Sequence, residues 1–158
     1  MRARNDVRTR LSHVLVAIAF LAAFGALGLG AAHAADRQRL TIEGRIECVG
    51  PTGKKVACNA DSQRFALRTD DGTLYRFSPE DPLANLFKDA RVRQRRFQIK
   101  VWTRDDAYVD IVKIYSIKQG RLYDIYFYCP VCSIRSYEAG DCWCCHQPYE
   151  LREVPVDE

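Results

Sequence analysis

The chain has 158 residues and a formal net charge of +4. Residues 1–34 hold four of its 24 basic residues and one of its 20 acidic residues, so the remaining chain carries a net charge of +1. This near-neutral balance argues against nucleic acid as a partner. A chain of this length supports one modest hydrophobic core and a small appendage that depends on metal or disulfides.

The N-terminal residues have the pattern of a secretory signal peptide. Basic residues precede an apolar run at positions 14–30, and the small-x-small sequence Ala32-His33-Ala34 follows. This predicts a signal peptide over residues 1–34, cleaved between Ala34 and Ala35, and a periplasmic or secreted protein. The alternative is a retained membrane anchor, and an uncleaved segment of this kind is the one membrane contact that we expect.

Residues 35–120 read as short strands separated by turns. Apolar and polar residues alternate over 40–48, and two further pairs of alternating runs, 65–77 and 97–115, each enclose a turn. Between these pairs, residues 78–89 have the composition of a short helix. The order is therefore strand, strand, strand, helix, strand, strand.

This order resembles, in architecture alone, the small Greek-key barrel of the OB-fold. We therefore expect a mainly β protein with an OB-like barrel over residues 35–120, and an SH3-like barrel or a small sandwich would fit the same strands. The basic stretch at residues 91–100 is interpreted as the solvated face of a strand rather than as a nucleic-acid site.

Cys48 and Cys58 flank a loop rich in turn-forming residues, with Gly53 near its centre. A bend at Gly53 would place the two thiols opposite each other. We predict a disulfide, which closes an eleven-residue loop and stabilises a small exported domain by about 3 kcal/mol. The alternative is a second metal or redox pair, but the loop contains no histidine.

The C-terminal module, residues 121–158, contains the most informative motif. An alternating strand at 122–128 leads into Cys129 and Cys132, and Cys142 and Cys145 form a second Cys-x-x-Cys pair. Two such pairs on tight turns suit tetrahedral thiolate coordination of zinc, with copper or iron as alternative ions. The pattern predicts a zinc-ribbon-like module with these four ligands, and Cys144 as a substitute for Cys145 or a free thiol.

The sequence from Tyr128 to Leu151 resembles the small heavy-metal-binding domain attached to bacterial periplasmic efflux adaptors and copper-transporting ATPases. That family has the pattern Tyr-x-Cys-Pro-Met-His-Pro, then Pro-Gly-x-Cys-Pro-x-Cys-Gly-Met. This chain has Val131 and Cys132 in place of Met and His, His146 and Gln147 in place of Gly and Met, and a gap one residue shorter. The resemblance implies metal binding, and the loss of both methionines favours zinc over Cu(I).

Other uses of the same cysteines remain open. Cys142, Cys145 and His146 also satisfy Cys-x-x-Cys-His, the attachment motif of c-type haem, which would make the protein an electron carrier. Exported cysteines can instead form disulfides, giving a disulfide-stapled binding domain, or exchange electrons as a redox pair. A labile ligand at Cys144 would suit a periplasmic metal chaperone or sensor.

The sequence offers no catalytic constellation. Neither a nucleophile elbow nor a phosphate loop occurs, and His146 is the one histidine after residue 34. We therefore expect no catalytic residues. The predicted function is an exported metal-binding protein, with the ribbon as a structural or interaction module for a protein partner in the cell envelope.

Overall fold

The computed structural model describes residues 37–59 and 64–156, which belong to one compact unit. The predicted signal peptide and its cleavage site lie outside the described residues. The fold is mainly β, as predicted, and its strands form one eight-stranded sheet. The strands are β1 (Arg39–Cys48), β2 (Phe65–Arg68), β3 (Leu74–Phe77), β4 (Arg96–Thr103), β5 (Tyr108–Lys118), β6 (Arg121–Cys129), β7 (Ile134–Ser136) and β8 (Glu150–Pro155).

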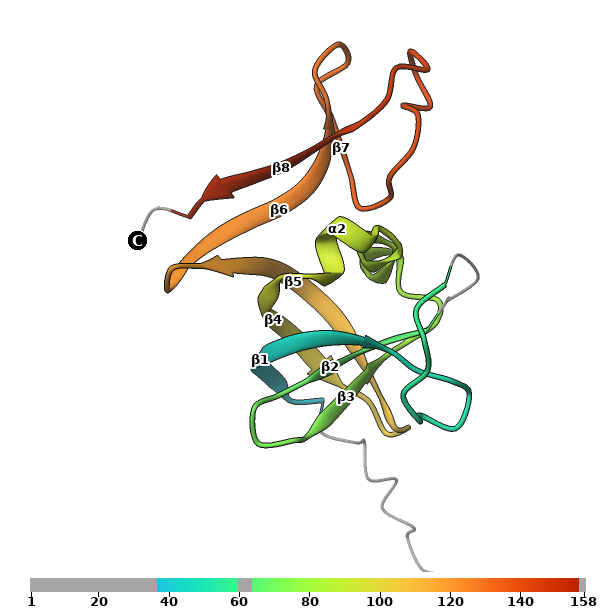
Figure 1. The fold of residues 1–158 in the computed structure, drawn as a ribbon, viewed down its shortest axis with the longest axis vertical. Coiled ribbons are helices and arrows are strands. Elements are labelled where there is room, and N and C mark those ends of the chain that lie inside the picture. Colours follow the sequence, from blue (N-terminus) through green and yellow to red (C-terminus); the bar gives the residue numbers. More distant parts are fainter. Residues whose placement is uncertain (1–36, 60–63, 157–158) are drawn as a thin grey trace, which may run out of the picture. The chain divides into compact units, whose positions relative to one another are not determined.

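The first five strands close into a ring, called the strand ring below (Figure 1). β1 pairs antiparallel with β2 and β4, β2 with β3, and β4 with β5. Parallel pairing of β3 with β5, where Arg76 lies opposite Tyr108 and Phe77 opposite Val109, completes the ring. The predicted strand order and mainly β class are confirmed, the structure has a ring of strands over the predicted region, and its likeness to an OB-fold stays a prediction.

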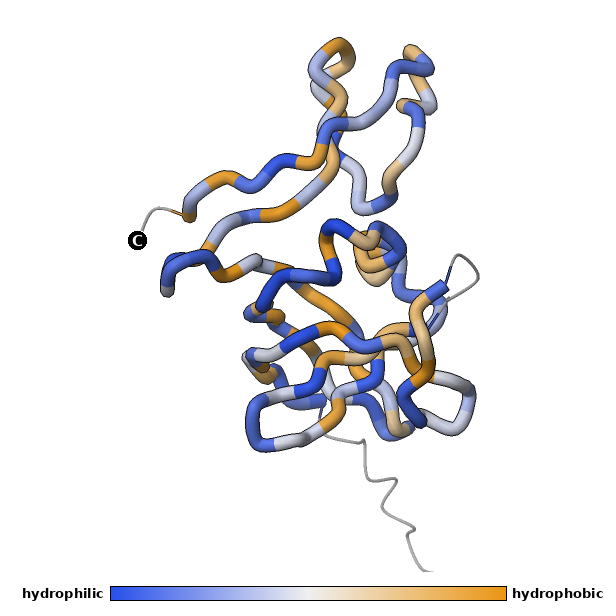
Figure 2. The backbone as a smooth tube through the Cα atoms, in the orientation of Figure 1, coloured by the Kyte–Doolittle hydropathy of each residue, from blue (hydrophilic) through white to orange (hydrophobic). Residues whose placement is uncertain are grey.

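Alternating burial along the strands builds the core. In β1 the side chains of Ile42, Ile46 and Cys48 are buried while their neighbours face outward. Figure 2 shows hydrophilic and hydrophobic segments changing repeatedly along the backbone. Gly44 is required where β1 approaches β2, because an added Cβ would lie 2.0 Å from the Arg68 carbonyl oxygen. The centre of the core is the ring of Phe87, whose centroid lies 5.4–6.0 Å from those of three other buried rings: Phe65, Phe77 and Phe97.

The predicted helix between β3 and β4 is two short pieces, the 3-10 helix η1 (Pro82–Lys88) and the single turn α2 (Ala90–Arg93). Asp81 caps η1 by accepting a hydrogen bond from the Leu83 N–H, and its second oxygen accepts from the Ile111 N–H of β5 at 2.6 Å. The interpretation of 91–100 as one strand face was wrong. Asp89 caps a helical turn there, and β4 begins at Arg96.

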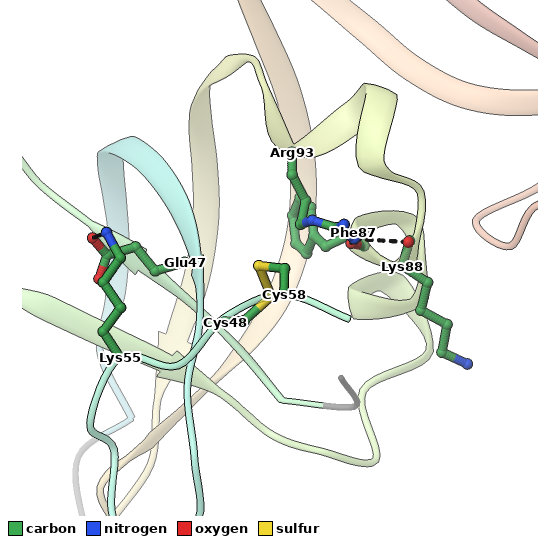
Figure 3. The surroundings of a disulfide bond; sticks show 7 residues. All are labelled: Glu47, Cys48, Lys55, Cys58, Phe87, Lys88 and Arg93. Atoms are coloured by element: carbon green, nitrogen blue, oxygen red, sulfur yellow. Dashed lines mark hydrogen bonds and ion pairs between the residues drawn. A yellow bond between two sulfur atoms is a disulfide. The ribbon is translucent and has the colours of Figure 1, made fainter. Parts of the chain in front are cut away.

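The loop after β1 contains the predicted disulfide between Cys48 and Cys58, whose Cα atoms are 5.3 Å apart. Gly53 has a positive φ of 78°, and its N–H bonds the Gly50 carbonyl, so the bend lies where the sequence predicted it. Figure 3 shows the disulfide beside Phe87 of the core. The bridge therefore attaches an exposed loop to the aromatic centre of the strand ring.

The cysteine-rich module, called the ribbon below, continues from the sheet of the ring. After a turn at Gln119 and Gly120, β6 pairs with β5 over residues 121–124. β8 pairs with residues 123–128 of β6, and β7 pairs with the last three residues of β6 (Figure 1). The proposed domain boundary after residue 120 falls in this turn, and it stays a prediction.

A network of ionic hydrogen bonds links the ribbon to the ring through Glu153 of β8. Its carboxylate accepts two bonds from Arg95, at 2.8 and 2.9 Å, one from the Ser116 hydroxyl at 2.7 Å, and pairs with Lys118 at 2.6 Å. The Glu153 side chain is 9% exposed. Because a buried carboxylate needs such partners, this network defines where β8 lies against β5 and the end of α2.

Candidate metal centre

The first cysteine pair lies at the tip of the β6–β7 hairpin. Cys129 is the last residue of β6 and lies opposite Ile134 in the ladder. The four residues between them form the turn, and Ser133, directly after Cys132, has a positive φ of 56°. This turn lets the Cys132 N–H point at the Cys129 sulfur, at 3.4 Å.

The second pair lies in a turn with the same local conformation. An isolated bridge between Asp141 and Pro148 forms its base, and the Cys142 N–H bonds the Gln147 carbonyl at 2.8 Å. The His146 N–H bonds the Cys142 carbonyl at 2.8 Å, and His146 has a positive φ of 58°. In both pairs, therefore, the residue after the second cysteine has a left-handed backbone conformation, and the turn surrounds the first cysteine.

The two turns bring together the four predicted ligands, whose sulfurs all lie within 4.8 Å of one another: Cys129, Cys132, Cys142 and Cys145. Cys129 and Cys142, the first cysteine of each pair, are buried, whereas Cys132 and Cys145 are partly exposed. The Cys129 and Cys145 sulfurs are 3.4 Å apart. Four thiolates in this arrangement could hold one metal ion in a tetrahedral shell without an open position.

Backbone amides and a tyrosine act on the first cysteine of the second pair. Burial would raise the pKa of Cys142, but the N–H groups of Cys145 and Cys144 and the hydroxyl of Tyr149 outweigh burial and lower the pKa to about 6. These donors stabilise a thiolate, which is the form that binds metal. The lowered pKa therefore favours the thiolate form of Cys142, which can bind a metal ion.

Neighbouring thiols and burial oppose ionisation at Cys129 and Cys132. The Cys132 N–H lowers the pKa of Cys129, but burial and the thiols of Cys145 and Cys142 raise it further than this donor lowers it. The pKa of Cys132 is raised, chiefly by hydrogen bonds with the thiols of Cys144 and Cys145. A cation at the centre would favour all four thiolates and release these protons.

Tyr149 is a site residue that the sequence did not indicate. It is half-buried beneath the second turn and its N–H bonds the Gly140 carbonyl. Burial, together with the hydrogen bond to Cys142, raises the pKa of the Tyr149 hydroxyl. Tyr149 reaches Cys142 because the chain runs back beside Gly140 after the second turn. A spacing motif does not predict such a contact.

The remaining predicted site residues lie outside the four-sulfur group. Cys144 is exposed, as is His146, and Trp143 is 76% exposed. The thiols of Cys142 and Cys145, which a c-type haem would need, face the first cysteine pair instead. Cys48 and Cys58 form the separate disulfide described above.

Comparisons with models of protein families, with curated proteins and with solved structures find no match for this chain. Among the described residues, no helix has the length and apolar character needed to cross a membrane.

Proposed function

We propose that the protein is exported and binds one zinc ion through Cys129, Cys132, Cys142 and Cys145, with the ribbon acting as a structural or interaction module. One observation supports this proposal above all. The two cysteine pairs lie in turns that share a left-handed residue after the second cysteine, and these turns bring the four sulfurs together. Four thiolates suit zinc, which accepts tetrahedral sulfur coordination and needs no open position in a structural site.

Two further observations support export. The N-terminal sequence has the pattern of a signal peptide. A disulfide such as Cys48–Cys58 is typical of proteins in oxidising compartments, because thiols in reducing compartments are kept reduced. The partner proposed for the ribbon is a protein of the cell envelope.

The geometry favours a metal ion over haem. A haem attached at Cys142 and Cys145 would require both sulfurs to turn away from Cys129 and Cys132, breaking up the four-sulfur group. It would also leave the first pair without a role. His146, the proposed axial ligand, is exposed and forms the turn through its backbone N–H.

We propose no catalytic role for the charged hollow on the strand ring. A hollow of about 420 Å³ on the strand ring is lined by Arg37, Arg104 and three aspartates. Its arginines are already paired, Arg37 with Asp110 and Arg104 with Asp106 and Asp110. Such mutually satisfied charges are typical of a structural ion-pair network.

Cobalt substitution tests the metal site directly. Titration of the reduced full chain with Co²⁺ should saturate at one ion per chain and give the intense absorption of tetrahedral cobalt thiolate, which added Zn²⁺ should abolish. Cys142→Ser should lose this signal, whereas Cys48→Ser/Cys58→Ser should retain it. A wild-type protein that binds no ion, or binds it without a thiolate signal, would refute the proposal.

A further inference from the structure

The sheet has one face that points away from the core and continues from the strand ring into the ribbon. It is formed by alternate residues of β1, β4, β5 and β6, which follow one another across the sheet, and of β7 and β8 beside β6 (Figure 1). The charged residues of this outer face are seven basic and four acidic ones: Arg39, Arg45, Arg96, Lys100, Lys113, Arg135, Arg152, Glu43, Asp110, Asp124 and Glu150. Seven against four leaves the outer face with an excess of three positive charges.

Five of these basic side chains lie over aromatic rings of the same face. The Cζ atoms of three arginines are 4.0–4.8 Å from ring centroids: Arg39 over Trp102, Arg135 over Tyr126 and Arg152 over Tyr128. The ammonium groups of two lysines lie 5.5–5.8 Å from the centroid of Tyr115: Lys100 and Lys113. Cation–π attraction restrains these side chains and leaves N–H donors for other partners, so the outer face presents its cations in defined positions.

The carboxylates of the protein do not neutralise all of these cations. Arg39 and Lys100 are exposed, and among residues 37–59 and 64–156 neither of them forms an ion pair. Lys113 and Arg135 share a single carboxylate, that of Asp124, at 2.6 and 3.4 Å. The outer face can therefore bind further carboxylates without breaking an ion pair of the fold.

The aromatic and apolar side chains of the outer face disfavour other kinds of polyanion. Bases of single-stranded nucleic acid, like sugar rings, bind by stacking on open aromatic rings. Here cations cover the rings, all of which are buried or only partly exposed: Trp102, Tyr115, Tyr126 and Tyr128. A lipid surface takes up a large apolar face, whereas the exposed large apolar side chains here are two valines, Val112 at 38% and Val154 at 43%. Carboxylate side chains of a protein need neither feature.

The spacing of the two unpaired cations matches an extended acidic chain. Arg39 lies opposite Trp102 in the ladder and Lys100 lies opposite Thr41, so the two cations are diagonal neighbours on β1 and β4. Such neighbours have Cβ atoms about 7–8 Å apart. Side chains on alternate residues of an extended segment are about 7 Å apart. Two carboxylates at alternate positions of a bound segment would therefore face both cations.

We propose that the outer face binds an extended acidic segment of a partner protein, with carboxylates on alternate residues paired to Arg39 and Lys100. The Arg39 guanidinium donates two N–H bonds to one carboxylate, and the Lys100 ammonium donates to the next. The remaining cations of the face attract the segment over a longer range. This interaction goes beyond the proposed metal site and is independent of it, because both residues belong to the strand ring.

Binding of a fluorescent peptide of alternating glutamate and serine residues to the full chain tests the proposal. Fluorescence anisotropy should show saturable binding at low ionic strength that weakens as salt is added. Arg39→Gln/Lys100→Gln should weaken binding by about fivefold. Lys54→Gln/Arg121→Gln removes the same charge from two exposed residues outside the outer face and should weaken it by less than about twofold. Equal losses in the two double variants, or no binding by wild type, would overturn the proposal.

Two further measurements complete the test. Without any substitution, the peptide should shift the backbone NMR signals of Thr41 and Trp102 and leave that of Lys54 unchanged, and the reverse pattern would contradict the proposal. Polygalacturonate, oligo-thymidylate and phosphatidylglycerol vesicles, at equal anionic charge, should bind more weakly than the peptide. Tighter binding of any one of them would refute a protein partner. Zinc content measured in the same samples distinguishes a failure of the metal site from a failure of this interaction.

Discussion

Two residues in the left-handed region, Ser133 and His146, explain how both turns present their sulfurs. Each follows the second cysteine of its pair, with φ of 56° and 58°. A side chain at such a position costs about 1–2 kcal/mol, a strain that glycine avoids. The protein accepts this strain where the chain must turn back from the ligands.

Replacement of His146 by glycine should therefore stabilise the protein. We expect His146→Gly to bind zinc as wild type does and to raise the free energy of unfolding by about 0.5–1 kcal/mol, after the added flexibility of the unfolded chain is counted. Chemical denaturation of the zinc-loaded protein measures the change. His146→Ala is the control and should show no gain. Loss of bound zinc in His146→Gly would contradict this expectation.

Tyr149 contributes to the site through its hydroxyl, which lowers the pKa of Cys142. Removing a hydrogen bond to a metal ligand weakens binding by about 10–100-fold in well-studied sites. We expect Tyr149→Phe to lower zinc affinity by about tenfold while leaving the fold intact, because the ring is retained. Competition with a chelator measures this, and Tyr137→Phe serves as a control. Unchanged affinity would show that the hydroxyl has no role.

At the level of elements, β8 is positioned by Glu153 as well as by its pairing with β6. A charged group with several ionic partners and little exposure is costly to replace with a neutral one. We expect Glu153→Gln to lower the free energy of unfolding by about 2–3 kcal/mol. Glu150→Gln, on the same strand but with a side chain 56% exposed, should change it by less than about 0.5 kcal/mol. Similar losses in both variants would contradict this assignment.

The same network predicts a dependence on pH. Burial alone would raise the pKa of Glu153, but Arg95, Lys118 and Ser116 lower it to about 2, below its ordinary value of 4.5. The lowered pKa means that ionised Glu153 is more stable in the folded than in the unfolded protein. Glu153 therefore contributes its full stabilisation above pH 4.5 and loses it as the pH falls toward 2. The stability difference between wild type and Glu153→Gln should shrink over that range. A constant difference would show that the ionised carboxylate is not the cause.

The disulfide stabilises the loop between β1 and β2. Cys48→Ser/Cys58→Ser should lower the free energy of unfolding by about 3 kcal/mol, because the open loop gains conformational entropy in the unfolded chain. Zinc content should not change, since neither residue belongs to the four-sulfur group. Denaturation and metal analysis of the double variant test both statements. A loss of zinc from the double variant would show that the loop affects metal binding by the ribbon.

Local patterns predicted most of these elements, and long-range contacts account for what they missed. Alternation identified β1, and cysteine spacing identified the four ligands, because both signals repeat within a few residues. The turn α2 was missed because its arginines suit either a helix or a strand face. The ion pair between Arg95 and Glu153 spans 58 positions, and no local pattern connects them.

At the level of the whole molecule, the ring and the ribbon depend on different interactions. The ring has the apolar core and the disulfide. The ribbon has few large buried side chains beyond β6, so its two turns should depend on metal, which contributes about 10–16 kcal/mol in comparable small modules. We therefore expect the ribbon to behave like a small domain that folds when it binds an ion.

Metal removal should therefore unfold the ribbon turns and spare the ring. We expect amide hydrogen exchange at Cys142 and His146 to become fast after chelation under reducing conditions, while Ile99 and Ile114 in the core stay protected. Re-addition of zinc should restore protection at the two turn positions. Continued protection at Cys142 without metal would show that the turns are stable by themselves.

The measurement that tests the central claim most directly is elemental analysis, with a visible absorption spectrum, of the mature protein isolated without refolding from the periplasm of its own host. One zinc per chain, unreactive thiols at the four ligand cysteines and no Soret band are the predicted result. A Soret band would identify a cytochrome. Neither metal nor haem, with the ribbon cysteines oxidised, would identify a disulfide-stapled domain and contradict the account.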